Sequence, residues 1–307
     1  MKKNNCKWDK SWSNGATKVI DCAECGFKHQ YPYPDQNETN EFYEKEYYET
    51  IKPQYLEGVK KEQLNRVMWA NDKLKVFDQL IKYSDDDRRI LDVGCSFGTF
   101  LSVFKDTGWD CVGVEPSIYA AKYAREVNGL TVHENLLENI SIEELGGSFD
   151  VVHIKETLDH LLNPIEFIER CSTELLNTNG ILCIETGNQF SEMQMAIVES
   201  SETPMWWIVP DHIAYFDKES LTALVNKYGF EVKYEMSTFP MELFPLMGDD
   251  FVSQPELGKD CHKKRLSFED KLNRSSMNHV RIHFYEALAK DGYGRGIIQI
   301  SQKADKK

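Results

Sequence analysis

One segment in the first third of the chain constrains the fold more than any other. Residues 89–101 begin as an apolar run, break at Gly94 and Gly98, and resume with helix-like spacing. This pattern predicts a buried strand, a tight turn and a helix. Because glycine lacks a β-carbon and the start of a helix offers unpaired amide groups, the turn is a place where a ligand can approach the backbone. The segment therefore predicts a small-ligand site.

The spacing of the glycines argues against a nicotinamide dinucleotide. A dinucleotide-binding turn has glycines at relative positions one, three and six, whereas this chain has Gly94, Ser96 and Thr99 there. Asp92 suits a ligand with a cationic group better than a pyrophosphate. The second expected strand ends at Glu115, where open α/β sheets place an acid that accepts hydrogen bonds from ribose hydroxyls. A nicotinamide-dependent oxidoreductase is therefore disfavoured.

At this point the sequence resembles the class I S-adenosylmethionine-dependent methyltransferases. Their acid-x-Gly-x-Gly-x-Gly motif is similar to residues 92–98, Asp-Val-Gly-Cys-Ser-Phe-Gly, in which serine replaces the middle glycine. Residues 149–160 look like the family's fourth strand and its Leu-Glu-His segment, and residues 175–186 look like the helix end, turn and fifth strand. The resemblance covers residues 86–235. It implies an α/β fold, a Rossmann-like sheet with helices on both faces.

The resemblance also implies S-adenosylmethionine as the cofactor and a set of residues around it. Glu115 would meet the ribose, and Asn135, in the turn after the third strand, would contact the adenine amino group. Backbone atoms just past the fourth strand would lie beside the methionine portion. The expected cofactor-binding residues are Asp92, Gly94, Cys95, Ser96, Gly98, Glu115, Pro116, Asn135, Lys155 and Glu156.

Acceptor chemistry is expected in residues 205–217. The stretch resembles the His-x-x-Tyr-Phe segment of small-molecule members of the family, and in related sugar methyltransferases this histidine, here His212, is implicated in proton removal. An imidazole titrates near neutrality and can take a proton as the methyl group transfers, and Asp211 or Tyr215 could orient it. His160 matches the Leu-Glu-His histidine and is the second candidate base, since it could equally orient backbone. The alternative for His212 is a structural histidine packed among aromatic side chains.

Residues 1–84 are expected to form an added N-terminal module. Cys22 and Cys25 have the spacing that lets two thiolates reach one tetrahedral ion, and Cys6 and His29 could complete a set of four zinc ligands. Certain sugar methyltransferases that the chain resembles carry a zinc-binding N-terminal segment with two Cys-x-x-Cys pairs, and only one full pair is present here. The competing interpretation is a folded turn with two reduced thiols.

Helices are expected to complete this module as a lid. Residues 38–48 have aromatic side chains at helical spacing, and these tyrosines either pack against the main domain or line the substrate site. A further helix is expected over residues 58–83, with buried positions at helical spacing. Residues 85–89 would then lead into the first strand.

A methyltransferase domain at residues 85–235 is expected to be complete before a C-terminal extension at residues 236–307. The apolar stretch at 239–250 would cover the crevice or form a partner surface, through which the chain could form oligomers. The basic cluster at residues 262–265 is interpreted as a solvated helix face, with binding of a substrate phosphate or carboxylate as the alternative. A last strand is expected at residues 297–300.

Charge and composition narrow the possible partners. The chain has 50 acidic and 36 basic residues, and its net charge of −14 would repel phosphate backbones and anionic bilayers. Nucleic acid is therefore a poor candidate partner. The sequence shows no membrane-spanning run and no signal peptide, and its eight scattered cysteines fit reduced thiols. We expect a soluble, cytoplasmic protein whose partner is a small molecule.

These features together predict an enzyme that transfers a methyl group from S-adenosylmethionine to a small molecule. The preferred acceptor is a hydroxyl of a sugar or nucleotide-linked sugar, in polysaccharide or metabolite biosynthesis. Methyl transfer to a lipid or quinone-like acceptor is the first alternative, which the aromatic and methionine-rich C-terminal segment favours. Transfer to a sugar carbon and a non-catalytic S-adenosylmethionine-binding module are the others.

Overall fold

Seven strands form one sheet at the centre of the computed structural model, which describes residues 6–35, 54–82, 87–201 and 203–304. The strand order is β10-β11-β8-β7-β4-β5-β6. Five neighbouring strands run parallel, and they are β4 (Arg89–Val93), β5 (Asp110–Val114), β6 (Thr131–His133), β7 (Phe149–Lys155) and β8 (Leu176–Gly187). Their nearly continuous apolar sequences are typical of parallel strands, which are covered on both faces.

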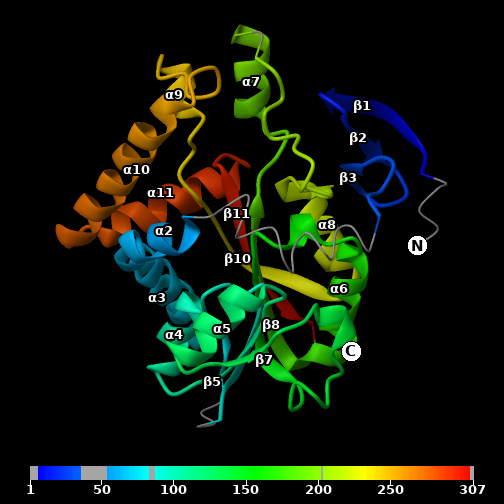
Figure 1. The fold of residues 1–307 in the computed structure, drawn as a ribbon, viewed down its shortest axis with the longest axis vertical. Coiled ribbons are helices and arrows are strands. Elements are labelled where there is room, and N and C mark those ends of the chain that lie inside the picture. The colour runs from blue at the N-terminus through cyan, green and yellow to red at the C-terminus, as the bar shows by residue number, and fades with distance from the viewer. Residues whose placement is uncertain (1–5, 36–53, 83–86, 202, 305–307) are drawn as a thin grey trace.

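Helices cover both faces of the sheet (Figure 1). One face carries α3 (Gln63–Leu80), α4 (Thr99–Lys105) and α5 (Ile118–Glu126), and the other carries α6 (Pro164–Arg170) and α8 (Lys218–Lys227). Successive residues of β4 face opposite ways, so that Ile90 packs under the first group of helices and Leu91 under the second. The predicted Rossmann-like sheet with helices on both faces is confirmed.

The last strand lies inside the sheet, between two earlier strands. β11 (Gly296–Lys303) pairs antiparallel with β8 on one side and with β10 (Phe230–Ser237) on the other. Ile298 and Ile300 of β11 are at most 1% exposed, which explains why this strand is so apolar. The sheet is therefore not complete at residue 235, and the expectation that the C-terminal residues only follow the core is corrected.

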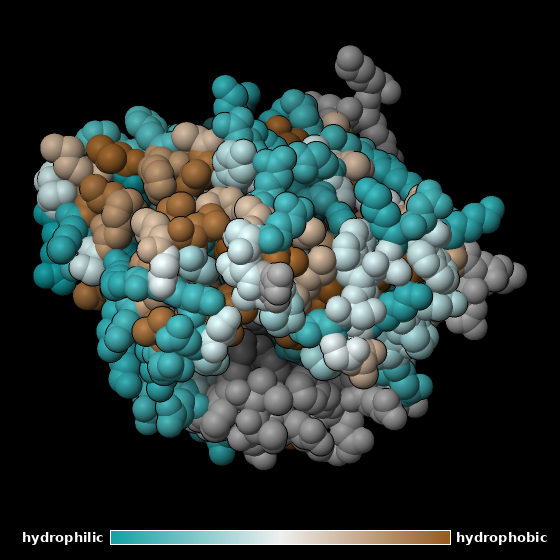
Figure 2. Space-filling model, turned by 90° about the horizontal axis from the view of Figure 1, so that it is seen from above, coloured by the Kyte–Doolittle hydropathy of each residue, from teal (hydrophilic) through white to brown (hydrophobic). Residues whose placement is uncertain are grey.

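Three helices precede β11. They are α9 (Leu243–Leu246), α10 (Glu256–Arg274) and α11 (Asn278–Lys290). Two of them, α10 and α11, pack beside α3. Figure 2 shows apolar side chains gathered on the side of the molecule where these helices lie, and the exposed apolar residues there are Leu246, Met247, Met277, Val280 and Phe284.

The basic cluster lies on α10, where its members pair with acids: His262 with Glu62, Lys263 with Asp260, Lys264 with Asp249 and Arg265 with Glu269. This pairing agrees with a charge-balanced helix face.

The N-terminal residues form a second, antiparallel sheet of four strands. It consists of β1 (Trp8–Asn14), β2 (Thr17–Cys22), β3 (Phe27–Gln30) and β9 (Ala214–Tyr215). The short β9 belongs to the segment where acceptor chemistry is expected, so this sheet joins the N-terminal residues to the site. The helix expected at residues 38–48 lies outside the described residues. The helix expected at 58–83 is instead two helices, α2 (Tyr55–Lys61) and α3.

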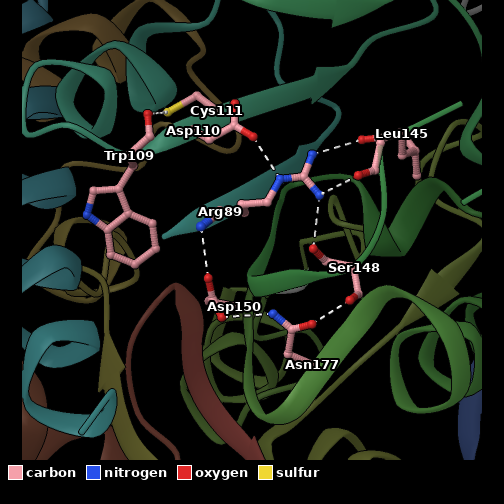
Figure 3. Close-up of polar contacts among 9 residues, drawn as sticks. Arg89, Trp109, Asp110, Cys111, Leu145, Ser148, Asp150 and Asn177 are labelled. Atoms are coloured by element: carbon pink, nitrogen blue, oxygen red, sulfur yellow. Dashed lines mark hydrogen bonds and ion pairs between the residues drawn. The ribbon is translucent and has the colours of Figure 1, made fainter. Parts of the chain in front are cut away.

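The amino ends of the parallel strands are held by a polar cluster around Arg89 (Figure 3). The Arg89 guanidinium lies 2.7 Å from Asp110 and donates to the carbonyls of Leu145 and Ser148, while its backbone amide donates to Asp150. These contacts fix the register of β4, β5 and β7 at the edge opposite the glycine turn.

No helix among the described residues is both long and apolar enough to cross a bilayer.

Candidate functional site

A cavity of about 1530 Å³ lies at the carboxyl ends of β4, β5, β7 and β8. Ligands of open α/β sheets bind at this edge, and a pocket for one small ligand measures roughly 300–1,000 Å³. The cavity therefore has room for a donor and an acceptor together. Nine of the ten expected cofactor-binding residues line it: Asp92, Gly94, Cys95, Ser96, Glu115, Pro116, Asn135, Lys155 and Glu156.

The glycine turn after β4 has a left-handed backbone. Gly94 has φ 73°, and Ser96, which stands where the family motif has glycine, has φ 51°. A β-carbon at Gly94 would collide with the side chain of Thr157, so the turn lies directly against the loop after β7. Gly98 lies outside the cavity wall, contrary to expectation. It begins α4 with φ 76°, and a β-carbon there would overlap Leu130, so this glycine serves helix packing.

Glu115 stands at the carboxyl end of β5, as expected, and is 4% exposed. Its Oε2 accepts from the amide of Ser96 at 2.8 Å and its Oε1 from the amide of Ser117 at 2.9 Å. Burial raises the pKa of Glu115 to about 7, against the lowering effect of these two amide groups. The carboxyl group is thus tied to the glycine turn, in the place where a ribose hydroxyl would meet it.

Asp92 is paired with a buried histidine. His153 of β7 lies with Nδ1 2.6 Å from Asp92 Oδ1, and Phe100 stacks on its ring at 3.8 Å. Burial lowers the pKa of His153, so the imidazole is neutral and donates its Nδ1 proton to the carboxylate. The histidine therefore orients Asp92 at the end of β4.

Lys155 is engaged in a buried charge network. Its Nζ lies 2.6 Å from Glu185 Oε1, and Lys73 Nζ lies 2.5 Å from Glu185 Oε2. Burial opposes ionisation of Glu185, but the two lysines overcome this effect and hold its pKa well below the usual range. Glu156 follows with φ 46° and donates its amide to the Glu185 carbonyl at 2.7 Å. The lysine side chain therefore binds within the protein, and the strained backbone of Glu156 faces the cavity.

Asn135 lies in the expected turn after β6, but its amide oxygen is engaged. The oxygen accepts from the amide of Leu136 at 2.9 Å and from the side chain of Asn139 at 3.1 Å. An adenine amino group would need this same oxygen as its acceptor. As placed here, Asn135 shapes the turn that borders the cavity and does not offer the expected contact.

His212 lines the far end of the same cavity, between two partners that the sequence did not indicate. Its Nδ1 lies 2.8 Å from Gln189 Nε2, and its Nε2 lies 3.8 Å from Asp159 Oδ2. Asp159 is 3% exposed, and its Oδ1 has no hydrogen-bond partner among the described residues. A buried carboxylate beside an imidazole stabilises the imidazolium that forms when the imidazole takes a proton. With its Nε2 toward Asp159, the imidazole has Nδ1 as its proton-accepting nitrogen, and the Gln189 amide contacts that nitrogen.

His160 and Tyr215 support the segment that carries His212. His160 Nδ1 donates to the carbonyl of Asp211 at 2.6 Å, and its ring meets that of His212 edge to face at 4.9 Å. The Tyr215 hydroxyl donates to the carbonyl of Val209 and is not part of the cavity wall. Burial raises the pKa of Tyr215, so this phenol stays protonated. The expectation of a catalytic Tyr215 is corrected to a structural contact.

Several buried polar atoms at this end have no partner among the described residues. They are Asp159 Oδ1, Thr186 Oγ1, Gln189 Oε1, Trp206 Nε1 and Trp207 Nε1, and all five residues line the cavity. The two indole rings lie 4.8 Å apart, nearly perpendicular to each other. Buried polar groups normally have partners, so this end fits a ligand that offers both an aromatic face and hydrogen-bonding groups.

The four expected metal ligands come together in the N-terminal sheet. One donor atom from each of Cys6, Cys22, Cys25 and His29 lies within 4.8 Å of the others. Zinc–sulfur bonds of about 2.3 Å in a tetrahedron place the ligand atoms about 3.8 Å apart, so the set fits zinc after a small contraction. His29 Nδ1 donates to the Gln30 carbonyl at 2.7 Å, which leaves Nε2 directed at Cys6 Sγ, 3.6 Å away. Such an outer hydrogen bond is typical of a metal-ligating histidine.

Other residues in the cavity wall escaped the sequence analysis. Arg66 of α3 and Arg295 at the start of β11 both line it, and Arg295 lies 2.7 Å from Glu242. Neither belongs to a motif, and each reaches the cavity from a segment distant in sequence. Asp159 could have been noted, because it occupies the middle position of the Leu-Glu-His segment.

The comparisons with known proteins agree with this geometry. A family model described as a methyltransferase domain matches residues 66–235, more than half of the chain. A ubiquinone biosynthesis O-methyltransferase of Cereibacter sphaeroides is 26% identical over 149 residues, which are 47% of this chain and 60% of that protein. The same enzyme of Rhodopseudomonas palustris is 29% identical over 175 residues, 55% of this chain and 67% of that protein. The chain thus spans about three fifths to two thirds of the length of these relatives.

Among solved structures, the plantazolicin methyltransferase BpumL in complex with SAH has a TM-score of 0.53. It is 15% identical, and the match covers 87% of this chain and 94% of that protein. A likeness at this identity shows a shared fold.

Proposed function

Because this chain belongs to the methyltransferase-domain family of S-adenosylmethionine-dependent class I enzymes, we propose that it methylates a hydroxyl of a small, aromatic, quinone-like acceptor. One observation carries the proposal. The Glu115 end and the His212 end share a single cavity, large enough for donor and acceptor together. Two features select the acceptor: the tryptophan wall with its unpartnered polar atoms, and the names of the ubiquinone biosynthesis relatives.

The residues around the glycine turn fit S-adenosylmethionine. The left-handed turn at residues 94–96 lines the cavity, and the buried carboxylate of Glu115 suits ribose hydroxyls. When bound, S-adenosylmethionine supplies an activated methyl group that reacts with a nucleophile and leaves S-adenosylhomocysteine. Arg66 is placed to meet the carboxylate of its methionine portion, since it lines the cavity near Glu156.

The protein contributes orientation and a proton acceptor. The acceptor ring would pack against Trp206 in the cavity wall, with its hydroxyl toward His212. The imidazole would take the hydroxyl proton on Nδ1, where the acceptor hydroxyl replaces the Gln189 amide, and Asp159 stabilises the resulting imidazolium through Nε2. Holding both molecules in one enclosed cavity supplies most of the acceleration, because it converts an encounter in solution into a positioned reaction.

We also propose that the cluster of Cys6, Cys22, Cys25 and His29 holds a structural zinc ion. Zinc stabilises small sheets of this kind by joining segments distant in sequence. The sheet includes β9, which begins two residues after His212, so the ion would support the acceptor end of the cavity.

The preferred sugar acceptor of the sequence analysis is the second candidate. It rests on the resemblance of the N-terminal cysteine segment and of the His-x-x-Tyr-Phe segment, whereas the matched relatives are named for ubiquinone rather than for polysaccharide biosynthesis. An assay with catechols, other phenols and nucleotide sugars, each with S-adenosylmethionine, separates the two by which class yields S-adenosylhomocysteine.

Binding is measured first, by calorimetric titration of S-adenosylhomocysteine into the native protein and into the Glu115→Ala variant. We expect saturable binding to the native protein and at least tenfold weaker binding to the variant. Turnover of a phenol should then be lost in His212→Ala while S-adenosylhomocysteine binding is kept. A folded native protein that binds no S-adenosylhomocysteine would refute the proposal, and turnover of nucleotide sugars alone would replace the acceptor.

A further inference from the structure

The N-terminal sheet and the acceptor end of the cavity are joined through the last residues of β3. We call residues 209–213, which carry His212, the acceptor loop. His29 pairs with Ala214 of β9, immediately after this loop, and the amide of Gln30 donates to the carbonyl of Ile213 at 2.8 Å. His29, a candidate metal ligand, therefore directly precedes Gln30, which bonds to the acceptor loop.

The Gln30 side chain contacts three of the five carbonyl groups of the acceptor loop. Its Nε2 lies 3.2 Å from the carbonyl oxygen of Val209, 2.8 Å from that of Pro210 and 2.9 Å from that of His212. The side chain is 8% exposed, so water has little access to replace these contacts. Loss of a buried donor leaves carbonyl groups unsatisfied, which costs more than the hydrogen bond itself contributes. No comparable set of side-chain bonds to this loop is found in the described part of the chain.

The other end of the connection is the candidate zinc cluster. The His29 ring donates from Nδ1 to the Gln30 carbonyl and directs Nε2 toward Cys6. Rotation of this ring, which an ion would prevent, breaks its bond to Gln30. Direct contacts thus connect the cluster to the acceptor loop. His29 of the cluster bonds to the Gln30 carbonyl, and the Gln30 side chain bonds to the His212 carbonyl.

We propose that Gln30 is a positioning residue for the acceptor site, and that metal at the Cys6, Cys22, Cys25 and His29 cluster keeps the acceptor loop, and with it His212, in place. The N-terminal sheet is then part of the acceptor site, while the glycine turn that meets the donor is independent of it. This inference rests on the proposed role of His212.

The first test removes the Gln30 donor without removing its bulk. Methionine has nearly the length of glutamine and packs flexibly, so Gln30→Met deletes the hydrogen bonds and retains the volume. We expect hydrogen exchange of the backbone amides in residues 211–215, followed by mass spectrometry, to become about tenfold faster. S-adenosylhomocysteine affinity and zinc content should stay within twofold of the native protein. With a phenol that is turned over, kcat should fall while the KM for S-adenosylmethionine is unchanged.

The matched control is Gln302→Met. Gln302 also donates from its side chain to a backbone carbonyl, that of Asn179, but it lies on β11 of the central sheet. Its substitution should leave exchange of residues 211–215 unchanged. Equal exchange of these residues in Gln30→Met and in the native protein, with zinc retained in both, would overturn the role of Gln30.

The second test removes the metal from the native full-length protein with a chelator. We expect faster exchange in residues 211–215 and retained S-adenosylhomocysteine binding, and zinc added back should restore the slow exchange. If metal removal leaves the exchange rate of residues 211–215 unchanged, the proposed coupling between the metal and the acceptor loop is overturned. A purified protein that takes up no zinc would overturn it as well. Absence of S-adenosylhomocysteine binding to the native protein would instead refute the proposed function, so the two failures are distinct.

Discussion

The Asp159→Asn substitution tests the proposed acceptor chemistry most directly. The variant keeps the size of the side chain and removes its charge. Asp159 Oδ2 lies 3.8 Å from His212 Nε2, and the two side chains are 4% and 24% exposed. Unit charges about 4 Å apart attract by about 4 kcal/mol at the effective dielectric constant of partly buried pairs. Because His212 retains some contact with solvent, we expect a loss of about 2–4 kcal/mol of transition-state stabilisation, which corresponds to a roughly 30- to 1,000-fold lower kcat.

The assay is turnover of a phenolic acceptor at saturating S-adenosylmethionine, with S-adenosylhomocysteine binding as the test of folding. Asp260→Asn is the matched control, because Asp260 forms an exposed ion pair with Lys263 on α10. Native binding and a reduced kcat in Asp159→Asn alone would support the role of the carboxylate. A kcat within threefold of the native value would refute the reasoning, since His212 would then need no charged partner.

Three further predictions follow from named contacts. S-adenosylhomocysteine affinity should fall by up to about tenfold between pH 8 and pH 6, because burial raises the pKa of Glu115 to about 7 and its charged form is the stronger acceptor for ribose hydroxyls. Calorimetry should show this pH dependence vanish in Glu115→Gln. Gly98→Ala should lower the free energy of unfolding by about 2–4 kcal/mol, because Gly98 has φ 76° and a β-carbon there would overlap packed neighbours. Gly248→Ala, at φ 104° but in open space, should lower it by only about 1 kcal/mol. Thermal denaturation measures both. Lys73→Met should lower the free energy of unfolding by about 2 kcal/mol near neutral pH. The deficit should shrink below about pH 4, because the unfolded state then binds a proton on Glu185 that the native folded protein, with its lowered pKa, does not bind. Equal deficits at pH 7 and at pH 3 would contradict this.

The parallel half of the fold could be predicted from the sequence because its determinants are local. The apolar runs of β4, β5, β7 and β8 and the turn at Gly94 are contiguous segments whose pattern states their structure. Glu115 after β5 and the spacing of Cys22 and Cys25 could be recognised for the same reason, since each is a short-range feature of the sequence. The position of β11 inside the sheet could not be predicted, because the pattern at residues 297–300 indicates a strand and not the neighbours with which it pairs.

The acceptor end was decided by tertiary structure alone. The sequence by itself determined a class I sheet, a glycine turn with its acid, and a candidate histidine at position 212. Only the folded chain sets Asp159 and Gln189 around that histidine, turns Tyr215 away from the cavity and ties the loop to Gln30. The contacts of His212 with Gln189 and with Gln30 join positions 23 and 182 residues apart in the chain. No periodicity encodes such pairs, because each depends on how two separate sheets pack against each other.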